Sequence, residues 1–207
     1  MNAAAAIAPM PEGKRRLIDA ALRLAARDGV ALTSLGLREL AREADLNHNT
    51  FYRHFGSLDE LGAAAADAVV TRLMSGMQAI RRSAVREGDA TVRAADFFLD
   101  FAREHPEVIV VGLRELHSVD SPLRGAMKKV LQDIAEDSAD QMQSLGLVAG
   151  LSREGLVDAS SAISYYIWYR SLDAIERPRQ RKAIRDDIVA FIRAQFLGRL
   201  ALERSAA

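Results

Sequence analysis

The stretch that decides the fold runs from Leu37 to Phe55 and has the sequence LRELAREADLNHNTFYRHF. Its apolar spacing predicts two short helices, Leu37–Ala44 and His48–Phe55, joined by a tight turn at Asp45-Leu46-Asn47. Two short helices joined in this way have the dimensions of a helix-turn-helix. The stretch therefore predicts a DNA-binding motif, provided that its outward side chains suit nucleic acid.

Apolar side chains would seat both short helices on one core. We expect Leu37 and Leu40 to pack the first helix inward and Leu46 to fill the turn. Phe51 and Phe55 stand four residues apart, so they lie on the same side of the second helix. The pattern leaves the opposite side of the second helix exposed.

The outward side chains of the second helix can all donate or share a hydrogen bond, and none is acidic. They are His48, Asn49, Thr50, Tyr52, Arg53 and His54. Asparagine and arginine can read base edges, whereas threonine, tyrosine and histidine suit phosphate contacts. Asn47 is a good N-cap for this helix. With Asn47 and Arg38, these residues form the predicted DNA-binding site.

Helical periodicity continues outward from this stretch, and alternating strand patterns are absent. Asp28-Gly29 is a natural helix stop, and Ser57-Leu58-Asp59-Glu60 has the pattern of a capping box. The β-branched run Val108–Val111 suggests a strand, but a lone strand would lack a partner, so a helix is expected there. The other helices are expected at about Lys14–Arg27, Ser57–Arg86, Ala90–Glu104, Glu107–Ser118, Pro122–Ser144, Arg153–Glu176 and Arg179–Leu202. The fold class predicted is all-α.

Composition and charge limit the alternatives only weakly. Of the 207 residues, 49% are hydrophobic, which is ordinary for a soluble globular protein, and the formal net charge is zero. From Met1 to Leu58, eight Lys or Arg residues oppose six Asp or Glu residues, so the basic excess is small. The chain has no cysteine, which excludes disulfides, thiolate metal sites and cysteine nucleophiles and fits a cytoplasmic protein.

The quoted residues resemble the DNA-binding domain of the TetR family. The likeness rests on Thr33–Ala44, Thr50–Phe55 and Asp59-Glu60-Leu61, and it covers about Lys14 to Leu61. It implies an all-helical homodimer whose recognition helices enter successive major grooves of double-stranded DNA, with the last two helices forming a four-helix bundle across the two-fold axis. Such a protein would be a transcriptional repressor that responds to a ligand.

The resemblance also assigns roles and a domain plan. It implies phosphate contacts for Tyr52 and His54, and base reading at His48, Asn49 and Thr50. It implies a three-helix DNA-binding domain at residues 12–58 and a ligand-binding and dimerisation domain at residues 59–207. Residues 1–11 are expected to be a flexible arm, since Met1–Met10 has neither a basic leader nor the long apolar core of a signal peptide. No stretch approaches the roughly 18 apolar residues of a membrane span, so no membrane partner is expected.

Two departures from the family pattern concern DNA binding. Asp45 stands where the family often has glycine before the apolar residue of the turn. Many members carry lysine after the aromatic cluster, where this chain has Gly56 and Leu58. The second departure removes expected phosphate contacts and puts affinity, not fold, in question.

The larger domain offers candidate ligand residues. Aromatic clusters usually form ordinary core, but some of these side chains point in several directions around one helix and could line a pocket or an interface. Arg114 and His117 either face solvent, or Arg114 anchors an acidic head group. The candidate residues are Phe97, Phe98, Phe101, Arg114, His117, Met127, Tyr165, Trp168 and Tyr169.

Within the family, Ser34–Leu61 looks most like the branch that regulates unsaturated fatty-acid synthesis. That likeness implies a small apolar or acyl ligand, such as a fatty acyl thioester, in a long apolar pocket. The wide apolar face of the last helix, with Ile184, Ile188 and Ile192 at four-residue spacing, fits burial against a second copy.

Three other interpretations stay open. An enzyme has little support, because the four histidines show no metal spacing and no phosphate loop, nucleotide fingerprint or nucleophile elbow occurs. No metal or cofactor is therefore expected. The chain could be a helical interaction module that kept this fold and lost its operator. It could also be a helix-turn-helix regulator outside the family, although the aromatic recognition helix argues against this.

Overall fold

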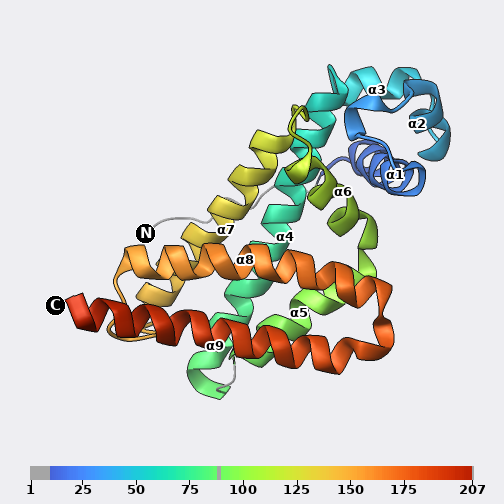
Figure 1. Cartoon of the computed structure of the whole chain (residues 1–207). Coiled ribbons are helices and arrows are strands. Elements are labelled where there is room, and N and C mark those ends of the chain that lie inside the picture. The colour runs from blue at the N-terminus through green and yellow to red at the C-terminus, as the bar shows by residue number, and fades with distance from the viewer. Residues whose placement is uncertain (1–9, 88–89, 207) are drawn as a thin grey trace. The chain divides into compact units, whose positions relative to one another are not determined.

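A computed structural model describes residues 10–87 and 90–206. Every regular element within these ranges is helical, which confirms the predicted all-α class (Figure 1). Residues 1–9 of the expected flexible arm lie outside the described residues. The elements in chain order are α1 Glu12–Asp28, η1 Leu32–Ser34, α2 Leu37–Glu43, α3 Asn49–His54, α4 Leu58–Glu87, α5 Ala90–Glu104, α6 Pro106–His117, α7 Arg124–Ser144, α8 Arg153–Glu176, η2 Pro178–Gln180 and α9 Arg181–Ala206.

The helix predictions differ from the structure mainly at their ends. The β-branched run Val108–Val111 lies inside α6, as expected. The predicted start at Pro122 is wrong, because Arg124 N–H bonds to the carbonyl of Ser121 in a turn before α7. The predicted start at Arg179 is also wrong, because a 3₁₀ turn precedes α9.

The chain divides into two compact units, Met1–Ala65 and Ala66–Ala207, and the division falls within α4. The domain boundary predicted between residues 58 and 59 stays a prediction. α4 therefore supplies residues to both units.

The amino-terminal unit has a small core of aliphatic and aromatic side chains. Gly29 ends α1 in the left-handed conformation (φ 69°), which glycine adopts without steric cost. Ser57 begins α4 by accepting a hydrogen bond from the N–H of Glu60 (3.1 Å), as the capping-box pattern predicts. The Glu60 carboxylate accepts from Gly56 N–H (2.7 Å). The fully buried large side chains of this unit include Leu17, Leu24, Leu40, Phe51, Phe55 and Leu61.

The larger unit is built around α8, which packs against α5, α6, α7 and α9. In Figure 1, α8 and α9 run side by side along most of their length. α6 approaches α8 closely at Gly112, where an added Cβ would lie 2.5 Å from the Trp168 ring. Trp168 is therefore a core residue that requires glycine on the neighbouring helix.

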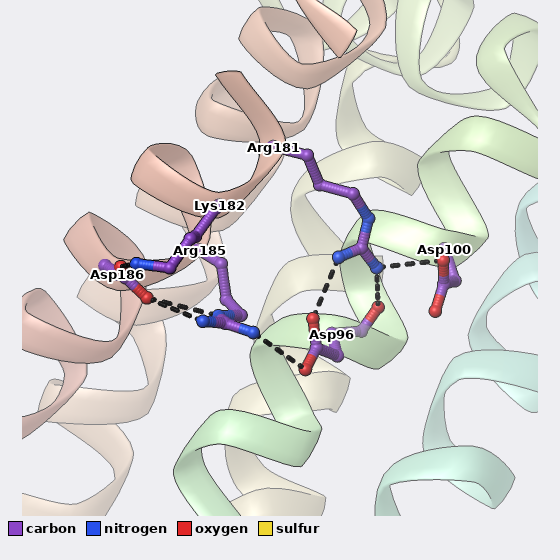
Figure 2. A network of polar contacts seen from close by, with 6 residues as sticks. All are labelled: Asp96, Asp100, Arg181, Lys182, Arg185 and Asp186. Atoms are coloured by element: carbon purple, nitrogen blue, oxygen red, sulfur yellow. Dashed lines mark hydrogen bonds and ion pairs between the residues drawn. The ribbon is translucent and has the colours of Figure 1, made fainter. Parts of the chain in front are cut away.

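An ion-pair network ties α5 to α9, as Figure 2 shows. The Arg181 guanidinium contacts Asp96 (2.9 Å) and Asp100 (2.8 Å), and Arg185 lies 3.8 Å from Asp96. The hydrogen bonds that Arg181 donates to the Asp96 carboxylate, and then to that of Asp100, raise the pKa of Arg181. Because several half-buried charges share partners, this network stabilises the helix pair more than isolated surface pairs would.

Candidate DNA-binding surface and ligand cavity

The helix-turn-helix forms at the predicted position, with α2 and α3 joined across Ala44–His48. Phe51 and Phe55 are both buried, with ring centroids 5.8 Å apart, so they seat α3 on the core of the unit. Leu46 in the turn and Leu37 on α2 are both half-buried. The predicted inward face is thus formed mainly by Leu40 and the two phenylalanines.

Asn47 caps α3 through its side chain. Its Oδ1 accepts a hydrogen bond from the N–H of Asn49 (2.9 Å), and its carbonyl accepts from Thr50 N–H (2.8 Å). These bonds satisfy amide groups that have no partner within the helix. Asn47 therefore fixes where α3 begins.

The outward face of α3 presents Asn49, Tyr52 and Arg53 to solvent. Tyr52 is 59% exposed, and its ring lies edge-on to His48 (5.7 Å between centroids). Thr50 and His48 are half-buried, although the helical pattern predicted that both face outward. Arg38 is exposed on α2.

His54 is also half-buried, because its ring rests against the start of α1. A Cβ added at Gly13 would lie 2.8 Å from His54 Nε2, so glycine leaves room for the imidazole. This contact could not be predicted from the sequence pattern, because Gly13 and His54 are far apart in the chain. The predicted phosphate role of His54 stays a prediction.

Ion pairs decide which cations of this unit are available to an outside anion. Arg16 pairs with Asp45 (2.9 Å), and Arg23 pairs with Glu43 (3.3 Å). Acidic neighbours also lie within ion-pair distance of Arg15, Arg27 and Arg42. Among the residues that the structure describes in this unit, the Lys and Arg side chains without an ion pair are Lys14, Arg38 and Arg53. The small basic excess of the sequence is thus concentrated on the helix-turn-helix and the start of α1.

Asp45 occupies the turn in the left-handed conformation (φ 51°). Aspartate tolerates this conformation better than most residues with a Cβ. Its side chain is 97% exposed and paired with Arg16, so it places a negative charge just before α3.

The larger unit contains a cavity of about 270 Å³ whose lining is mostly apolar. Residues of α4, α5, α7, α8 and α9 line it, together with Leu147 and Val148 from the loop between α7 and α8. Val148 has a left-handed backbone (φ 55°), which is strained for a β-branched residue. A second, smaller cavity of about 190 Å³ is lined by Leu99, Arg103, Pro106, Ala174, Ile175, Pro178 and Arg181.

Polar groups interrupt the wall of the larger cavity at a few places. Arg81 of α4 is 8% exposed, and it donates to Ser138 Oγ (2.5 Å) and to Gln141 Oε1 (2.8 Å). Burial lowers the pKa of Arg81 to about 10, and the nearby Asp137 carboxylate (3.8 Å) opposes this shift. Ser160 of α8 also lines the cavity.

Of the ligand residues predicted from the sequence, Phe98 lines the larger cavity. Met127 and Trp168 instead pack at Gly112, between α6 and α8. Arg114 is half-buried in α6, and His117 is exposed, where it contacts the hydroxyl of Tyr169. Phe101 is buried beside His105 (5.0 Å between ring centroids). The Phe97 ring packs against Gly76 of α4. Tyr165 is 37% exposed on α8. The structure brings some of these side chains together in pairs but does not gather them around one cavity, and their ligand roles stay predictions.

Sequence reasoning missed Arg81, Ser138 and Ser160, although a signal was present. Leu73, Met77 and Arg81 follow one another at four-residue spacing, so the arginine continues a buried apolar stripe. Ser160 likewise falls on the buried face of α8 with Leu156. A polar residue in an apolar helical stripe is informative, because it must find a partner inside the protein.

Within residues 10–87 and 90–206, no group of three or more His, Asp or Glu side chains is arranged to hold a metal ion. In the same part of the chain, no helix has both the length and the hydropathy needed to cross a membrane.

Comparison with known proteins agrees with this geometry. Residues 17–65 match the model of the bacterial regulatory proteins of the tetR family. A solved TetR-family transcriptional regulator from Syntrophomonas wolfei str. Goettingen superposes with a TM-score of 0.71 at 10% identity, over 90% of this chain and 95% of that chain. The fatty acid degradation regulator FadR from Bacillus halodurans gives a TM-score of 0.65 at 14% identity, over 91% and 94% of the two chains.

A third similar structure is FadR from Bacillus subtilis in complex with stearoyl-CoA, with a TM-score of 0.61 at 14% identity, over 86% of this chain and 96% of that chain. At these identities the structures establish a shared fold, while the family model establishes the amino-terminal domain. The amino-terminal domain therefore matches that of the bacterial regulatory proteins of the tetR family, and the chain shares its fold with solved TetR-family regulators.

Proposed function

We propose that the chain is a homodimeric repressor that binds a pseudo-palindromic operator and is controlled by a small apolar or acyl ligand in the larger cavity. The outward face of α3 carries this proposal. It presents Asn49, Tyr52 and Arg53 without any acidic side chain, and Arg53 has no ion-pair partner among the described residues. Asparagine and arginine can read base edges in the major groove, while tyrosine holds phosphate.

The exposed face of α8 and α9 supports the homodimer. Six large hydrophobic side chains are exposed among the described residues, and four of them lie on these two helices: Tyr165, Tyr169, Leu197 and Leu202. α9 also exposes three small residues at four-residue spacing, Ala190, Ala194 and Gly198. Small side chains let a second helix approach closely. A second copy that places the same two helices here would bury this face across a two-fold axis.

Control by a ligand would work through α4. Met77 and Arg81 of this helix line the cavity, and the same helix begins at Leu58 in the amino-terminal unit. A ligand that prefers one position of α4 would shift the population of dimers whose recognition helices fit the operator. An acyl ligand is supported by FadR from Bacillus subtilis, which has the same fold and was solved in complex with stearoyl-CoA.

Selection of the purified protein against a pool of genomic DNA fragments at near-physiological salt tests the DNA-binding function. We expect enrichment of a palindromic site with half-sites about one helical turn apart. Asn49→Ala should relax the preference at one position of each half-site, whereas Tyr52→Phe should weaken all sequences alike. Absence of any enriched site, with only weak salt-sensitive binding, would favour the module that has lost its operator.

The homodimer has its own test in light scattering of the full-length protein. Leu197→Arg places a charge within the proposed interface and should convert dimer to monomer. Val119→Arg is the matched control, because Val119 is 75% exposed but lies outside α8 and α9. A Leu197→Arg protein that stays dimeric would show that these helices do not form the interface.

A further inference from the structure

The larger cavity combines an apolar wall with a buried positive charge. Its volume of about 270 Å³ lies just below the range of roughly 300–1,000 Å³ that is usual for ligand sites. Aliphatic residues such as Ile134, Ile163, Ile167 and Ile192 form most of the wall. The volume suits a small molecule with a short apolar body.

Arg81 carries a charge that the protein itself balances only in part. The nearest carboxylate, Asp137, lies 3.8 Å away, and its Oδ1 also accepts a hydrogen bond from Gln78 Nε2 (2.7 Å). Arg81 Nη1 and Nη2 donate hydrogen bonds to neutral oxygens, those of Gln141 and Ser138. A guanidinium that is 8% exposed at an apolar cavity loses most of its hydration, and an anion in the cavity would compensate for that loss.

Ser160 provides an independent observation. Ser160 lines the cavity and is only 6% exposed. Its Oγ is buried and has no hydrogen-bond partner within the described residues. Ser164, one turn further along α8, is different, because its hydroxyl donates to the Ser160 carbonyl (2.8 Å). Buried hydroxyls are nearly always hydrogen-bonded, so the Ser160 hydroxyl is available to a ligand in the cavity.

From these observations we infer that the cavity binds a medium-chain carboxylate, with the carboxylate paired to Arg81 and hydrogen-bonded by the Ser160 hydroxyl, and the alkyl chain against the isoleucines. This inference rests on the proposed function, since it names the ligand class of the same cavity. A free acid makes better use of Arg81 than a thioester does, because a thioester carbonyl carries no charge. The cavity is also too small for the whole of a coenzyme A conjugate.

Isothermal titration calorimetry of the full-length protein with octanoate, octanol and octanoyl-coenzyme A tests the inference. The three probes share the alkyl chain and differ at the head group. We expect octanoate to bind about tenfold or more tightly than octanol, because only octanoate forms the charge-assisted pair. Equal or tighter binding of octanol would overturn the inference, as would binding of octanoyl-coenzyme A without octanoate, or no binding of octanoate.

Variants assign the effect to the two side chains. Arg81→Met should remove the preference for octanoate over octanol while octanol still binds, and Ser160→Ala should weaken octanoate roughly threefold. The matched controls are Arg82→Met, at an exposed position next on α4, and Ser161→Ala, beside Ser160 but outside the cavity lining. If Arg81 only bridged α4 to α7, Arg81→Met would lower the melting temperature and leave the octanoate preference intact.

The ligand and the function can fail separately. Calorimetry needs no DNA, and the DNA selection needs no ligand. Octanoate binding without an enriched DNA site would overturn the proposed function and leave the ligand class standing. An enriched DNA site without octanoate binding would overturn the ligand class and leave the DNA-binding function standing.

Discussion

The outward face of α3 and the larger cavity are both candidate binding sites, but they are assembled in different ways. The face of α3 comes from residues that follow one another between Asn47 and His54. The cavity draws residues from five helices and a loop, from Met77 to Phe196. A site within one short helix can be inferred from helical periodicity, whereas a site shared by distant segments depends on how those segments pack. The two sites also differ in their positive charge, because Arg53 on α3 is exposed whereas Arg81 at the cavity is buried.

The largest expected effect tests whether the two sites stand on separate cores. Phe51→Ala removes a ring that is 1% exposed and should lower the free energy of unfolding of the amino-terminal unit by about 3–5 kcal/mol. Operator binding should be lost while octanoate binding is kept. Differential scanning calorimetry and ligand titration measure the two outcomes.

The control for this change is the adjacent Tyr52→Ala, since Tyr52 is 59% exposed and should cost less than about 1 kcal/mol of stability. Loss of octanoate binding in Phe51→Ala, with one shared unfolding transition, would show that the two units do not fold independently.

A second change disturbs only the larger unit. Gly112→Ala would place a methyl group 2.5 Å from the buried Trp168 ring, and we expect overpacking to cost about 1–3 kcal/mol. Thermal unfolding followed by the fluorescence of Trp168, the single tryptophan of the chain, reports on this unit. Operator affinity per folded dimer should stay unchanged.

Gly125→Ala is the matched control with the opposite sign. Gly125 lies in α7 with open space around it, so alanine should stabilise the unit by roughly 0.5–1 kcal/mol through its better helix propensity. Similar losses in both variants would mean that the Gly112 contact is not what limits stability.

A third change tests the assignment of available charge. Arg53→Ala should weaken operator binding about tenfold and reduce the slope of log affinity against log salt by about one, because one phosphate or base contact is lost. Fluorescence anisotropy at several salt concentrations measures both quantities. Arg23→Ala should have a smaller effect, since Arg23 already pairs with Glu43. Equal effects of the two variants would refute the idea that internal ion pairs decide which cations bind DNA.

The smallest expected effect concerns the turn. Asp45→Asn keeps a residue that tolerates φ 51° and removes the exposed negative charge, so operator affinity should rise by roughly 0.3–1 kcal/mol with little change in stability. Asp45→Glu keeps the charge but suits the left-handed conformation less well, so it should lose stability without gaining affinity. An affinity gain in Asp45→Glu would remove charge as the explanation.

The amino-acid sequence by itself determined the helices, the helix-turn-helix and the outward face of α3. The Asn47 cap, the Gly29 stop and the Ser57 cap all act within four residues of their own position, and the structure contains each of them. The Phe51 and Phe55 spacing likewise fixed which side of α3 is buried. Short-range hydrogen bonds and helical periodicity are sufficient for such features.

Only the tertiary structure decided which cations are paired, which aromatic residues are core, and where the cavity lies. Arg16 finds Asp45, Trp168 finds Gly112, and Arg81 finds Ser138 across dozens of residues. Each of these contacts depends on how helices pack against one another, and side-chain periodicity within one helix carries no information about its partner. The position of α3 and its outward face could therefore be predicted from the sequence of that helix, whereas the cavity depends on how the larger unit packs.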